Sequence, residues 1–514
     1  MEDDTIVAVA TPPGRGALGI VRVSGHSTLS VLEKLFPNNA EWVDRRATVA
    51  TAQSASGLGI DETIVTVFRG PRSYTGEDMA EISCHGSPLI LDRLVEAALA
   101  AGARAARPGE FTLRAFLNGR LDLAQAEAVV DLVEARTDAG LELARRQLEG
   151  ELSKRVEPLR TQLVELLAHM TALVDFSEED IPSIAEREVS HTLETVGVDL
   201  DRILAGSHQG QVLSHGVSLA IVGAPNAGKS SILNGLLGRD RAIVTPIAGT
   251  TRDTLEEELS LAGVLFRIVD TAGMSRSADP VEALGVERSR AAIGAADIVL
   301  VVVDRSRELN DDDRQVFDII QREAGDRTVA VVLNKSDLPV RLTEWPPMAY
   351  QDTLVTGGGG DDAGEPVNRR GVGKRPRGSS SLERAVNDAA AESVLDVARD
   401  SPGINSAGPA AWPAVETSAV MPNGLNALRA LLPQVALAGP VPDGFVVSNV
   451  RHIQSLQVAA ETVRQAISGQ REGVPMDLIS LDVRVAVESL GSIMGIDIGD
   501  EVLDLVFSRF CIGK

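Results

Sequence analysis

Short apolar runs alternate with amphipathic, helix-like stretches between residues 216 and 435. Three of these runs, at 217–222, 264–269 and 329–333, have the length of strands, and each is followed directly by Gly, Asp or Asn. Strands buried on both faces read as continuous apolar runs, and strands that alternate with helices are typical of a parallel sheet. The pattern therefore predicts a doubly wound α/β domain at 216–435, with polar residues at the carboxyl ends of its strands.

The beginning of the chain has a different pattern. Residues 5–23 read as two strands joined by a tight turn, and residues 63–69 and 79–83 look like further strands. Residues 89–101 have apolar positions at helical spacing. We expect a mixed α+β domain at 1–118, with an antiparallel sheet and helices on one side of it.

Helix-like spacing dominates the stretches on either side of the α/β domain. Apolar residues recur at helical spacing from residue 121 to about residue 206, and again from about residue 449 to residue 510. We interpret these stretches as one all-helical domain assembled from two chain segments, 119–215 and 440–514. On this interpretation the α/β domain is inserted into the helical domain.

Residues 340–411 interrupt the α/β pattern. They include four consecutive glycines at 357–360 and a basic cluster at 369–377. This composition predicts a disordered insertion, with a short helix at 382–399. The basic residues could contact RNA phosphates, although a solvated loop is the better explanation for them.

Composition limits the class of protein. With 514 residues and a hydrophobic content of 44%, the chain is long enough for about three domains. A formal net charge of −24 means that any RNA contact must be a local patch or be shared with a partner. No apolar run is long enough to span a membrane, and the acidic start lacks the order of a signal peptide. Two cysteines form neither a disulfide framework nor a metal cluster, so we expect a cytoplasmic location and a structural role for Cys84-His85.

A phosphate-loop pattern follows the first apolar run. Gly223, four further residues, Gly228, Lys229 and Ser230 match G-x-x-x-x-G-K-[ST]. Glycines let backbone N–H groups turn toward phosphate oxygens, Lys229 adds a positive charge, and Ser230 offers a hydroxyl to Mg²⁺. A helix that begins near Lys229 would present its positive end to the same anion.

Three further motifs follow in the order that a GTP-binding protein requires, which argues against a chance match. Asp270-Thr271-Ala272-Gly273 follows the second apolar run, where P-loop NTPases hold Mg²⁺. Asn334, Lys335 and Asp337 form an NKxD motif, whose carboxylate accepts two N–H bonds that guanine supplies and adenine does not. Ser418-Ala419 fits the backbone contact to the guanine oxygen. The sequence therefore predicts that the ligand is GTP rather than ATP.

With these motifs in place, the chain resembles the bacterial tRNA modification GTPases of the MnmE (TrmE) family. The resemblance covers nearly the whole chain except 340–411, and it is specific because its motifs span three domains. The segments that carry it are TPPGRGALGIVRVSG at 11–25, YTGEDMAEISCHG at 74–86, RPGEFTLRAFLNGRLDLAQAEAVVDL at 107–132, GAPNAGKSS at 223–231, IAGTTRD at 247–253, DTAG at 270–273 and FCIGK at 510–514.

The resemblance implies a homodimer joined through the N-terminal domains. It also implies a flavin-dependent partner, MnmG (GidA), in a heterotetramer that installs a carboxymethylaminomethyl or aminomethyl group at C5 of the wobble uridine of certain tRNAs. A tetrahydrofolate derivative would supply the one-carbon unit. By motif match, its contacts would be Arg22, Glu81, Arg120 and Lys514. Arg120 stands where the family pattern has Lys, and without the resemblance these residues read as ordinary ion pairs.

The resemblance further implies how GTP is hydrolysed. Met274 follows DTAG, where many GTPases place the Gln that orients the attacking water. The family uses K⁺ to neutralise charge on the phosphates. Its implied ligands are Asn226, Thr245, Ile247 and Thr250, while Ser230 and Thr251 would hold Mg²⁺. Glu282 would orient or polarise the water and act with Lys229 in catalysis; without the resemblance, Glu282 reads as a solvated carboxylate.

The nucleotide and its ions would contact a larger set of residues. From the phosphate loop and the loop after it, these are Asn226, Ala227, Gly228, Lys229, Ser230, Ser231, Thr245, Pro246, Ile247, Ala248, Gly249, Thr250 and Thr251. From the later motifs, they are Asp270, Thr271, Ala272, Gly273, Asn334, Lys335, Asp337, Ser418 and Ala419.

Two other functions fit part of the sequence. A GTP-dependent binding switch, such as a ribosome-assembly factor, would have the same nucleotide motifs and would use slow turnover to time release. A folate-binding scaffold would have no need of intact guanine motifs. The TPPGRG and FCIGK segments favour the enzyme, and stimulation of hydrolysis by K⁺ over Na⁺ would distinguish it from the switch.

Overall fold

The computed structural model divides into two compact units. It describes residues 4–39, 41–175, 186–240, 257–269, 290–325, 327–343, 349–355, 412–439, 441, 444–496 and 498–513. Unit 1 consists of Met1–Glu134, Arg145–Gly197 and Gln454–Lys514, and unit 2 consists of Ala135–Ala144 and Val198–Ile453. Helical segments from before and after the nucleotide motifs therefore belong to the same unit.

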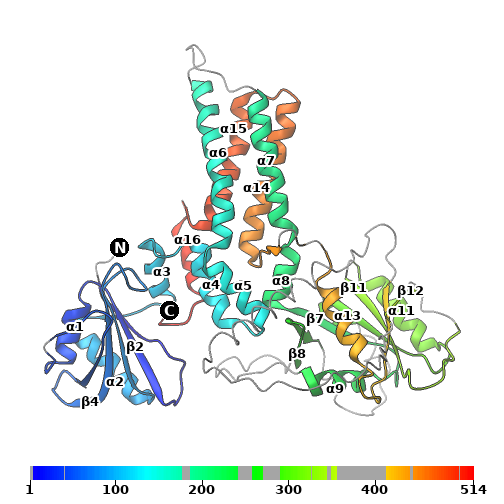
Figure 1. Cartoon of the computed structure of the whole chain (residues 1–514), viewed down its shortest axis with the longest axis horizontal. Coiled ribbons are helices and arrows are strands. Elements are labelled where there is room, and N and C mark those ends of the chain that lie inside the picture. The colour runs from blue at the N-terminus through cyan, green and yellow to red at the C-terminus, as the bar shows by residue number, and fades with distance from the viewer. Residues whose placement is uncertain are drawn as a thin grey trace, which may run out of the picture. The chain divides into compact units, whose positions relative to one another are not determined.

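A six-stranded sheet forms the N-terminal part of unit 1 (Figure 1). Its strand order is β3-β4-β5-β2-β1-β6, and neighbouring strands are antiparallel except for β1 and β6. The elements of this region are β1 (Ile6–Val9), β2 (Leu18–Ser24), α1 (Thr28–Leu35), β3 (Ala47–Gln53), β4 (Gly59–Phe68), β5 (Met79–His85), α2 (Pro88–Ala100) and β6 (Arg104–Ala105). The hydrophobic pattern predicts β1, β2, β4, β5 and α2, but it misses α1, β3 and β6.

Helices α1 and α2 pack on the same face of this sheet. Val21, Ile82 and Val65 are cross-strand neighbours on β2, β5 and β4, and all three are buried. They share a core with Leu32 of α1 and Leu94 of α2. Because side chains alternate along a strand, the residues on either side of each of these in its own strand point to the opposite face of the sheet.

That opposite face exposes apolar side chains. Val49 of β3 and Ile64 of β4 are directly paired, and their side chains are 66% and 47% exposed. Leu18 of β2 is 68% exposed. The paired residues Arg22 and Glu81 alternate with the buried residues of β2 and β5, so they belong to the same face.

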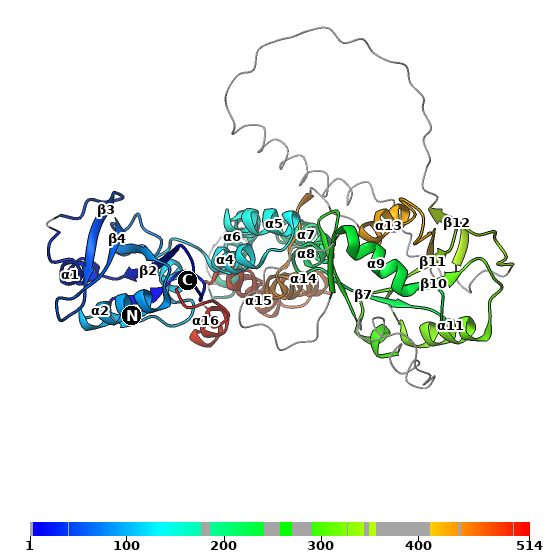
Figure 2. The same ribbon diagram turned by 90° about the horizontal axis from the view of Figure 1, so that it is seen from below.

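Four long helices, α6, α7, α14 and α15, lie side by side in both views (Figures 1 and 2). Buried residues of α6 recur every three or four positions, as Leu152, Val156, Leu159, Leu163, Leu166 and Met170, and α15 packs against this helix. The helices that are not given with either sheet are α3 (Glu110–Leu117), α4 (Leu123–Glu134), α5 (Asp138–Leu148), α6 (Glu151–Asp175), α7 (Glu186–Ala205), α14 (Val450–Arg471), α15 (Met476–Met494) and α16 (Asp500–Phe507). Within the described residues, no helix combines the length and the apolar character that a membrane crossing requires.

Unit 2 is built on a seven-stranded sheet of order β12-β13-β11-β10-β7-β9-β8. Its neighbouring strands are parallel except for β8 and β9. The elements are α8 (Ser207–His215), β7 (Val217–Val222), α9 (Lys229–Asp240), β8 (Glu257–Leu261), β9 (Val264–Ile268), β10 (Ile298–Asp304), α11 (Asp311–Glu323), β11 (Thr328–Asn334), β12 (Ala349–Val355), β13 (Trp412–Glu416) and α13 (Asn426–Ala436).

Both faces of this sheet are covered, as β10 makes clear. All residues of this strand are buried. Alternate residues Ile298, Leu300 and Val302 join a core that includes α9 and α13, whereas Val299, Val301 and Val303 join a core that includes α11. Helices on both faces of a parallel sheet explain why the strands read as continuous apolar runs.

One part of the predicted insertion at 340–411 is not disordered. Residues Ala349–Val355 form β12, which pairs in parallel with β13 at the edge of the sheet. The glycine-rich and basic composition of the stretch as a whole hides this short strand, whose sequence AYQDTLV mixes polar and apolar residues. The helix predicted at 382–399 lies outside the described residues.

Candidate functional site

The phosphate-loop sequence forms the turn between β7 and α9. Gly223 and Gly228 have φ angles of +154° and +102°, and Asn226 has a φ angle of +60°. A Cβ atom at Gly223 would lie 2.3 Å from the carbonyl oxygen of Val302, and one at Gly228 would lie 2.1 Å from Nδ2 of Asn334. The two glycines are therefore required by close packing as well as by their backbone conformation.

Lys229 folds back over this loop. Its ammonium group donates to the carbonyl oxygens of Gly223 at 2.8 Å and Ala224 at 2.9 Å. Burial lowers the pKa of Lys229, although the charge of Asp313 acts in the opposite direction. Ser230 and Ser231 are exposed in the first turn of α9, whose N-terminus carries the positive end of the helix dipole. Cationic and hydroxyl groups thus converge at a helix N-terminus suited to a phosphate group.

The guanine motif contacts the phosphate loop directly. Asn334 is buried at the end of β11, and its Nδ2 donates to the carbonyl oxygen of Ala227 at 2.9 Å. Its Oδ1 accepts a hydrogen bond from Thr417 at 3.3 Å. Three predicted motifs therefore meet at the carboxyl ends of β7, β11 and β13, where parallel α/β sheets bind ligands.

Asp337 and Ser418 also lie together. The Ser418 hydroxyl donates to Oδ1 of Asp337 at 2.6 Å. Ser418 is buried, whereas Asp337 is exposed. Ala419 follows Ser418 and is half-buried. Ser418 thus holds one oxygen of a carboxylate that is exposed to solvent.

Sequence reasoning misses two polar residues of this site, Asp304 and Thr417. Asp304 ends β10 and is 5% exposed, and its Oδ2 accepts from Nζ of Lys335 at 2.6 Å. Thr417 is fully buried, and its backbone oxygen accepts from the backbone N–H of Ser336 at 2.9 Å. The sequence does contain a signal for Asp304, because this acidic residue directly follows an apolar run, as Asp270 does.

The remaining nucleotide and catalytic residues predicted from the sequence lie outside the described residues. These are Thr245, Pro246, Ile247, Ala248, Gly249, Thr250, Thr251, Asp270, Thr271, Ala272, Gly273 and Glu282, and Lys514 of the predicted folate set is outside as well. Of the predicted metal ligands, the structure describes Ser230 and Asn226. In the described parts of the chain, no group of three or more His, Cys, Asp and Glu side chains could hold a metal ion.

Two of the predicted folate residues form an ion pair on the N-terminal sheet. Nη2 of Arg22 lies 2.7 Å from Oε1 of Glu81, and Nη1 of Arg22 donates to the carbonyl oxygen of Gly513 at 3.2 Å. The Arg22 guanidinium also lies 5.6 Å from the centre of the Tyr74 ring and 5.8 Å from that of Phe111. The structure therefore brings Arg22, Glu81 and the C-terminal segment together beside two aromatic rings.

Arg120 lies in a different contact. Its Nε donates to the carbonyl oxygen of Ser73 at 3.1 Å, in the residue that precedes Tyr74. The ion pair does not include Arg120. Arg120 and Arg22 contact the same loop, because Arg120 bonds to Ser73 and Arg22 lies over the ring of the adjacent Tyr74.

The two cysteines have contrasting environments. Cys84 is buried, and burial raises the pKa of its thiol to about 11. Cys511 is exposed. His85 is exposed as well, and its Nδ1 lies 2.9 Å from Asp61. Cys84 therefore packs as a small apolar residue, while His85 pairs with a carboxylate on the surface.

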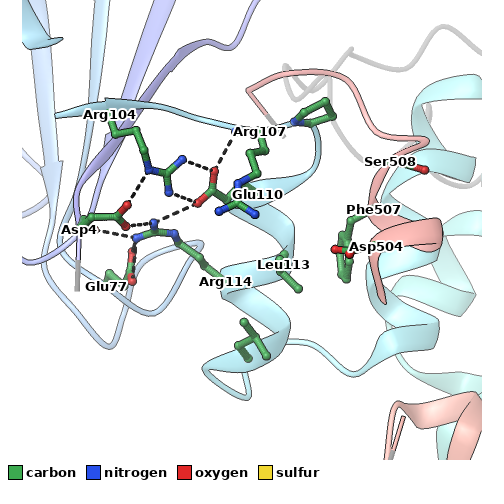
Figure 3. A pocket seen from close by; sticks show the side chains of 12 residues that line it. Asp4, Glu77, Arg104, Arg107, Glu110, Leu113, Arg114, Asp504, Phe507 and Ser508 are labelled. Atoms are coloured by element: carbon green, nitrogen blue, oxygen red, sulfur yellow. Dashed lines mark hydrogen bonds and ion pairs between the residues drawn. The ribbon is translucent and has the colours of Figure 1, made fainter. Parts of the chain in front are cut away.

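A hollow of about 560 Å³ lies between α3 and α16, within unit 1 (Figure 3). On one side, Asp4 accepts from Arg104 and Arg114 at 2.6 Å each, and Glu110 accepts from Arg104 at 2.6 Å. Phe507 of α16 lines the other side. The charged groups satisfy one another, so the cluster ties the start of the chain to α3 and does not by itself define a ligand.

The loop, the lysine and the guanine motif define a P-loop protein that binds guanine nucleotides. Comparison with known families agrees: the model described as GTP-binding protein TrmE N-terminus matches residues 5–120, and the model described as MnmE helical domain matches residues 123–511. The chain belongs to the MnmE family of tRNA modification GTPases.

Its relatives match from end to end. The tRNA modification GTPase MnmE of Roseiflexus sp. (strain RS-1) is 41% identical over 515 residues, which cover 100% of this chain and 99% of the relative. The protein of the same name from Roseiflexus castenholzii is 41% identical over 519 residues, with both chains fully covered. The one from Chloroflexus aurantiacus is 40% identical over 520 residues, again with full coverage of both.

Proposed function

We propose that this chain is a K⁺-activated GTPase that acts in the modification of tRNA. With a flavin-dependent partner of the MnmG (GidA) type, it would install a carboxymethylaminomethyl or aminomethyl group at C5 of the wobble uridine of certain tRNAs. The observation that carries the GTPase activity is the hydrogen bond from Asn334 to Ala227, which joins a guanine-reading motif to a phosphate loop. The link to tRNA rests on full-length similarity to relatives named for that modification.

Each part of this function would belong to one domain of the chain. Residues 1–118 would form the folate-binding and dimerisation domain, and residues 216–435 would form the GTPase domain. Segments 119–215 and 440–514 would together form a helical domain into which the GTPase domain is inserted. Most of both helical segments, Arg145–Gly197 and Gln454–Lys514, belongs to unit 1, which supports this arrangement.

At the nucleotide, Lys229 would bind the phosphates, and Asp337 with Ser418 would bind guanine. Ser230 and Thr251 would hold Mg²⁺, while Asn226, Thr245, Ile247 and Thr250 would hold K⁺. The described members of these sets fit, because Asn226 is exposed in the phosphate loop and Ser230 is exposed at the start of α9. When bound, the two cations supply positive charge against the negative charge that develops on the phosphates. Glu282 would orient the attacking water.

The folate site would include Arg22, Glu81, Arg120 and Lys514. The ion pair of Arg22 and Glu81, with the Tyr74 and Phe111 rings beside it, fits a ligand that has a flat heterocycle and ionisable groups. When bound, a tetrahydrofolate derivative supplies a one-carbon unit.

The exposed face of the N-terminal sheet supports a homodimer. Leu18, Val49 and Ile64 are exposed on the face that carries Arg22 and Glu81. Val49 and Ile64 are cross-strand neighbours, and contiguous apolar side chains on a protein surface commonly mark an interaction site. A second copy of the chain bound there would cover them and would place the folate residues next to the interface.

Two measurements test the proposal. Mass spectrometry of wobble nucleosides from cells that lack this chain should show loss of the modification, and a Glu282→Ala copy should fail to restore it. GTP hydrolysis by the purified protein should be faster in K⁺ than in Na⁺. Normal nucleosides in both strains would contradict the tRNA function and would favour a GTP-dependent binding switch, whereas equal rates in both salts would contradict K⁺ activation.

A further inference from the structure

Asp304 connects two neighbouring strands at the nucleotide site. In the register of β10 and β11, Asp304 pairs with Asn334, so the two side chains end adjacent strands. Asp304 is 5% exposed. Its Oδ1 accepts from both the backbone N–H and the hydroxyl of Ser306, at 3.0 Å and 2.6 Å. These two hydrogen bonds to Oδ1 fix the orientation of the carboxylate.

That second oxygen holds Lys335. Nζ of Lys335 lies 2.6 Å from Oδ2 of Asp304, whereas Nε of Arg307 lies 3.9 Å from the same oxygen. Arg307 instead pairs with Asp313 at 2.5 Å. Burial alone would raise the pKa of Asp304, but hydrogen bonds from Lys335 and Ser306 outweigh it and lower the pKa. The carboxylate thus stays ionised at neutral pH and pairs with Lys335.

The backbone at Lys335 needs such support. Its φ angle is +64°, a left-handed conformation that is unfavourable for a residue with a Cβ atom. The following residue, Ser336, donates its N–H to Thr417, and Asn334 before it is bonded to Ala227. Tertiary contacts therefore hold Asn334, Lys335 and Ser336, and the loop then presents Asp337.

We propose that Asp304 is a positioning residue for guanine recognition, which acts by holding Lys335 and thereby the loop that presents Asp337. The inference rests on the proposed GTPase function. Asp304 need not touch the nucleotide. Without its charge, Lys335 loses the ion-pair partner that helps to hold its left-handed backbone conformation, and the Asp337 carboxylate is no longer held at one fixed position against the base.

Base discrimination is the readout that separates positioning from general stability. Guanine offers Asp337 two N–H groups, whereas hypoxanthine lacks the exocyclic amino group and offers one. A well-placed carboxylate therefore favours GDP over IDP, and a displaced one loses that preference. A variant that is merely less stable would bind both nucleotides less well by the same factor.

The experiment measures dissociation constants for fluorescent GDP and IDP on the full chain, for wild type and for Asp304→Asn, Lys335→Met and the double variant. Asp304→Asn should weaken GDP binding by about tenfold and IDP binding by less. The double variant should bind no more weakly than Lys335→Met alone, because Asp304 acts through Lys335. Asp297→Asn is the matched control: this residue lies beside the opposite end of β10, also accepts from a serine N–H and hydroxyl, and should leave both constants unchanged.

Wild-type affinity and preference in Asp304→Asn would overturn the proposal, as would full additivity in the double variant. If Asp304→Asn does not yield folded protein, Asp304→Glu replaces it, since this change keeps the charge and alters its reach. Its GDP-to-IDP preference should fall, and an unchanged preference overturns the proposal. Failure of the wild-type chain to bind GDP would instead contradict the proposed GTPase function.

Discussion

Asn334 and Ala227 are 107 positions apart in the sequence, yet Nδ2 of Asn334 donates to the carbonyl oxygen of Ala227 at 2.9 Å. The bond joins the end of β11 to the loop after β7, across the intervening strand β10. Because of this bond, the NKxD motif and the phosphate-loop sequence cannot shift independently of each other. Substitutions on either side of this bond should therefore affect the binding of the whole nucleotide.

Gly228→Ala should abolish tight GTP binding. The added Cβ would lie 2.1 Å from Nδ2 of Asn334, and the φ angle of +102° is unfavourable for alanine. We expect affinity to fall by at least about 100-fold, measured with a fluorescent GTP analogue. Gly238→Ala is the control, because among the described residues outside its own helix no atom lies within 4 Å of a Cβ placed there. Equal affinity of the two variants would contradict the packing argument.

Asp337→Asn should change the preferred base. An amide in place of the carboxylate can donate to the C2 oxygen of xanthine, but it no longer accepts two N–H bonds from guanine. Hydrolysis of GTP at low concentration should fall by roughly 100-fold or more, and hydrolysis of XTP should rise. Asp311→Asn, at an exposed position in α11, should leave both activities unchanged. A loss of GTP hydrolysis with no gain for XTP would show that Asp337 does not read the base.

Glu110 should make the stability of unit 1 sensitive to acid. Burial would raise the pKa values of Glu110 and Asp4, but hydrogen bonds from Arg104 and Arg114 lower them below their ordinary values of 4.5 and 3.8. The stabilisation is therefore present above those values and is lost as the pH falls below them.

The substitution Glu110→Gln tests this relationship. It should lower the free energy of unfolding by about 2 kcal/mol at neutral pH and by less in acid, measured by urea unfolding. Glu149→Gln removes an exposed ion pair with Arg145 and should cost less than about 0.5 kcal/mol. The argument fails if Glu110→Gln has the same effect at both pH values.

Arg22→Ala should weaken the binding of a tetrahydrofolate derivative by about tenfold, because it removes a charged donor next to Tyr74 and Phe111. GTP hydrolysis should not change. Arg69→Ala is a matched control, since Arg69 pairs with Asp78 at 3.1 Å in the same domain. Calorimetric titration of both variants measures the effect, and equal folate affinity would remove Arg22 from the proposed site.

Local signals in the sequence predict much of the candidate site. The apolar run at 217–222 corresponds to β7, and the glycines and Lys229 follow it at fixed spacing. Elements with weak local signals were missed: β3 reads ATVATAQ, and Ala52 is its one fully buried residue, while α1 has eight residues. The pairing of Asp304 with Lys335 could not be predicted, because it depends on the order of strands in the sheet rather than on spacing along the chain.

The burial of Cys84 and the exposure of Cys511 make this chain suited to labelling without prior engineering. The sequence has two cysteines, and the one with a strongly raised pKa is also shielded from solvent. A maleimide dye should therefore attach at Cys511 alone in the native state. A single fluorophore at residue 511 would then lie two positions from Gly513, whose carbonyl oxygen accepts from Arg22, and would test whether a ligand changes that environment.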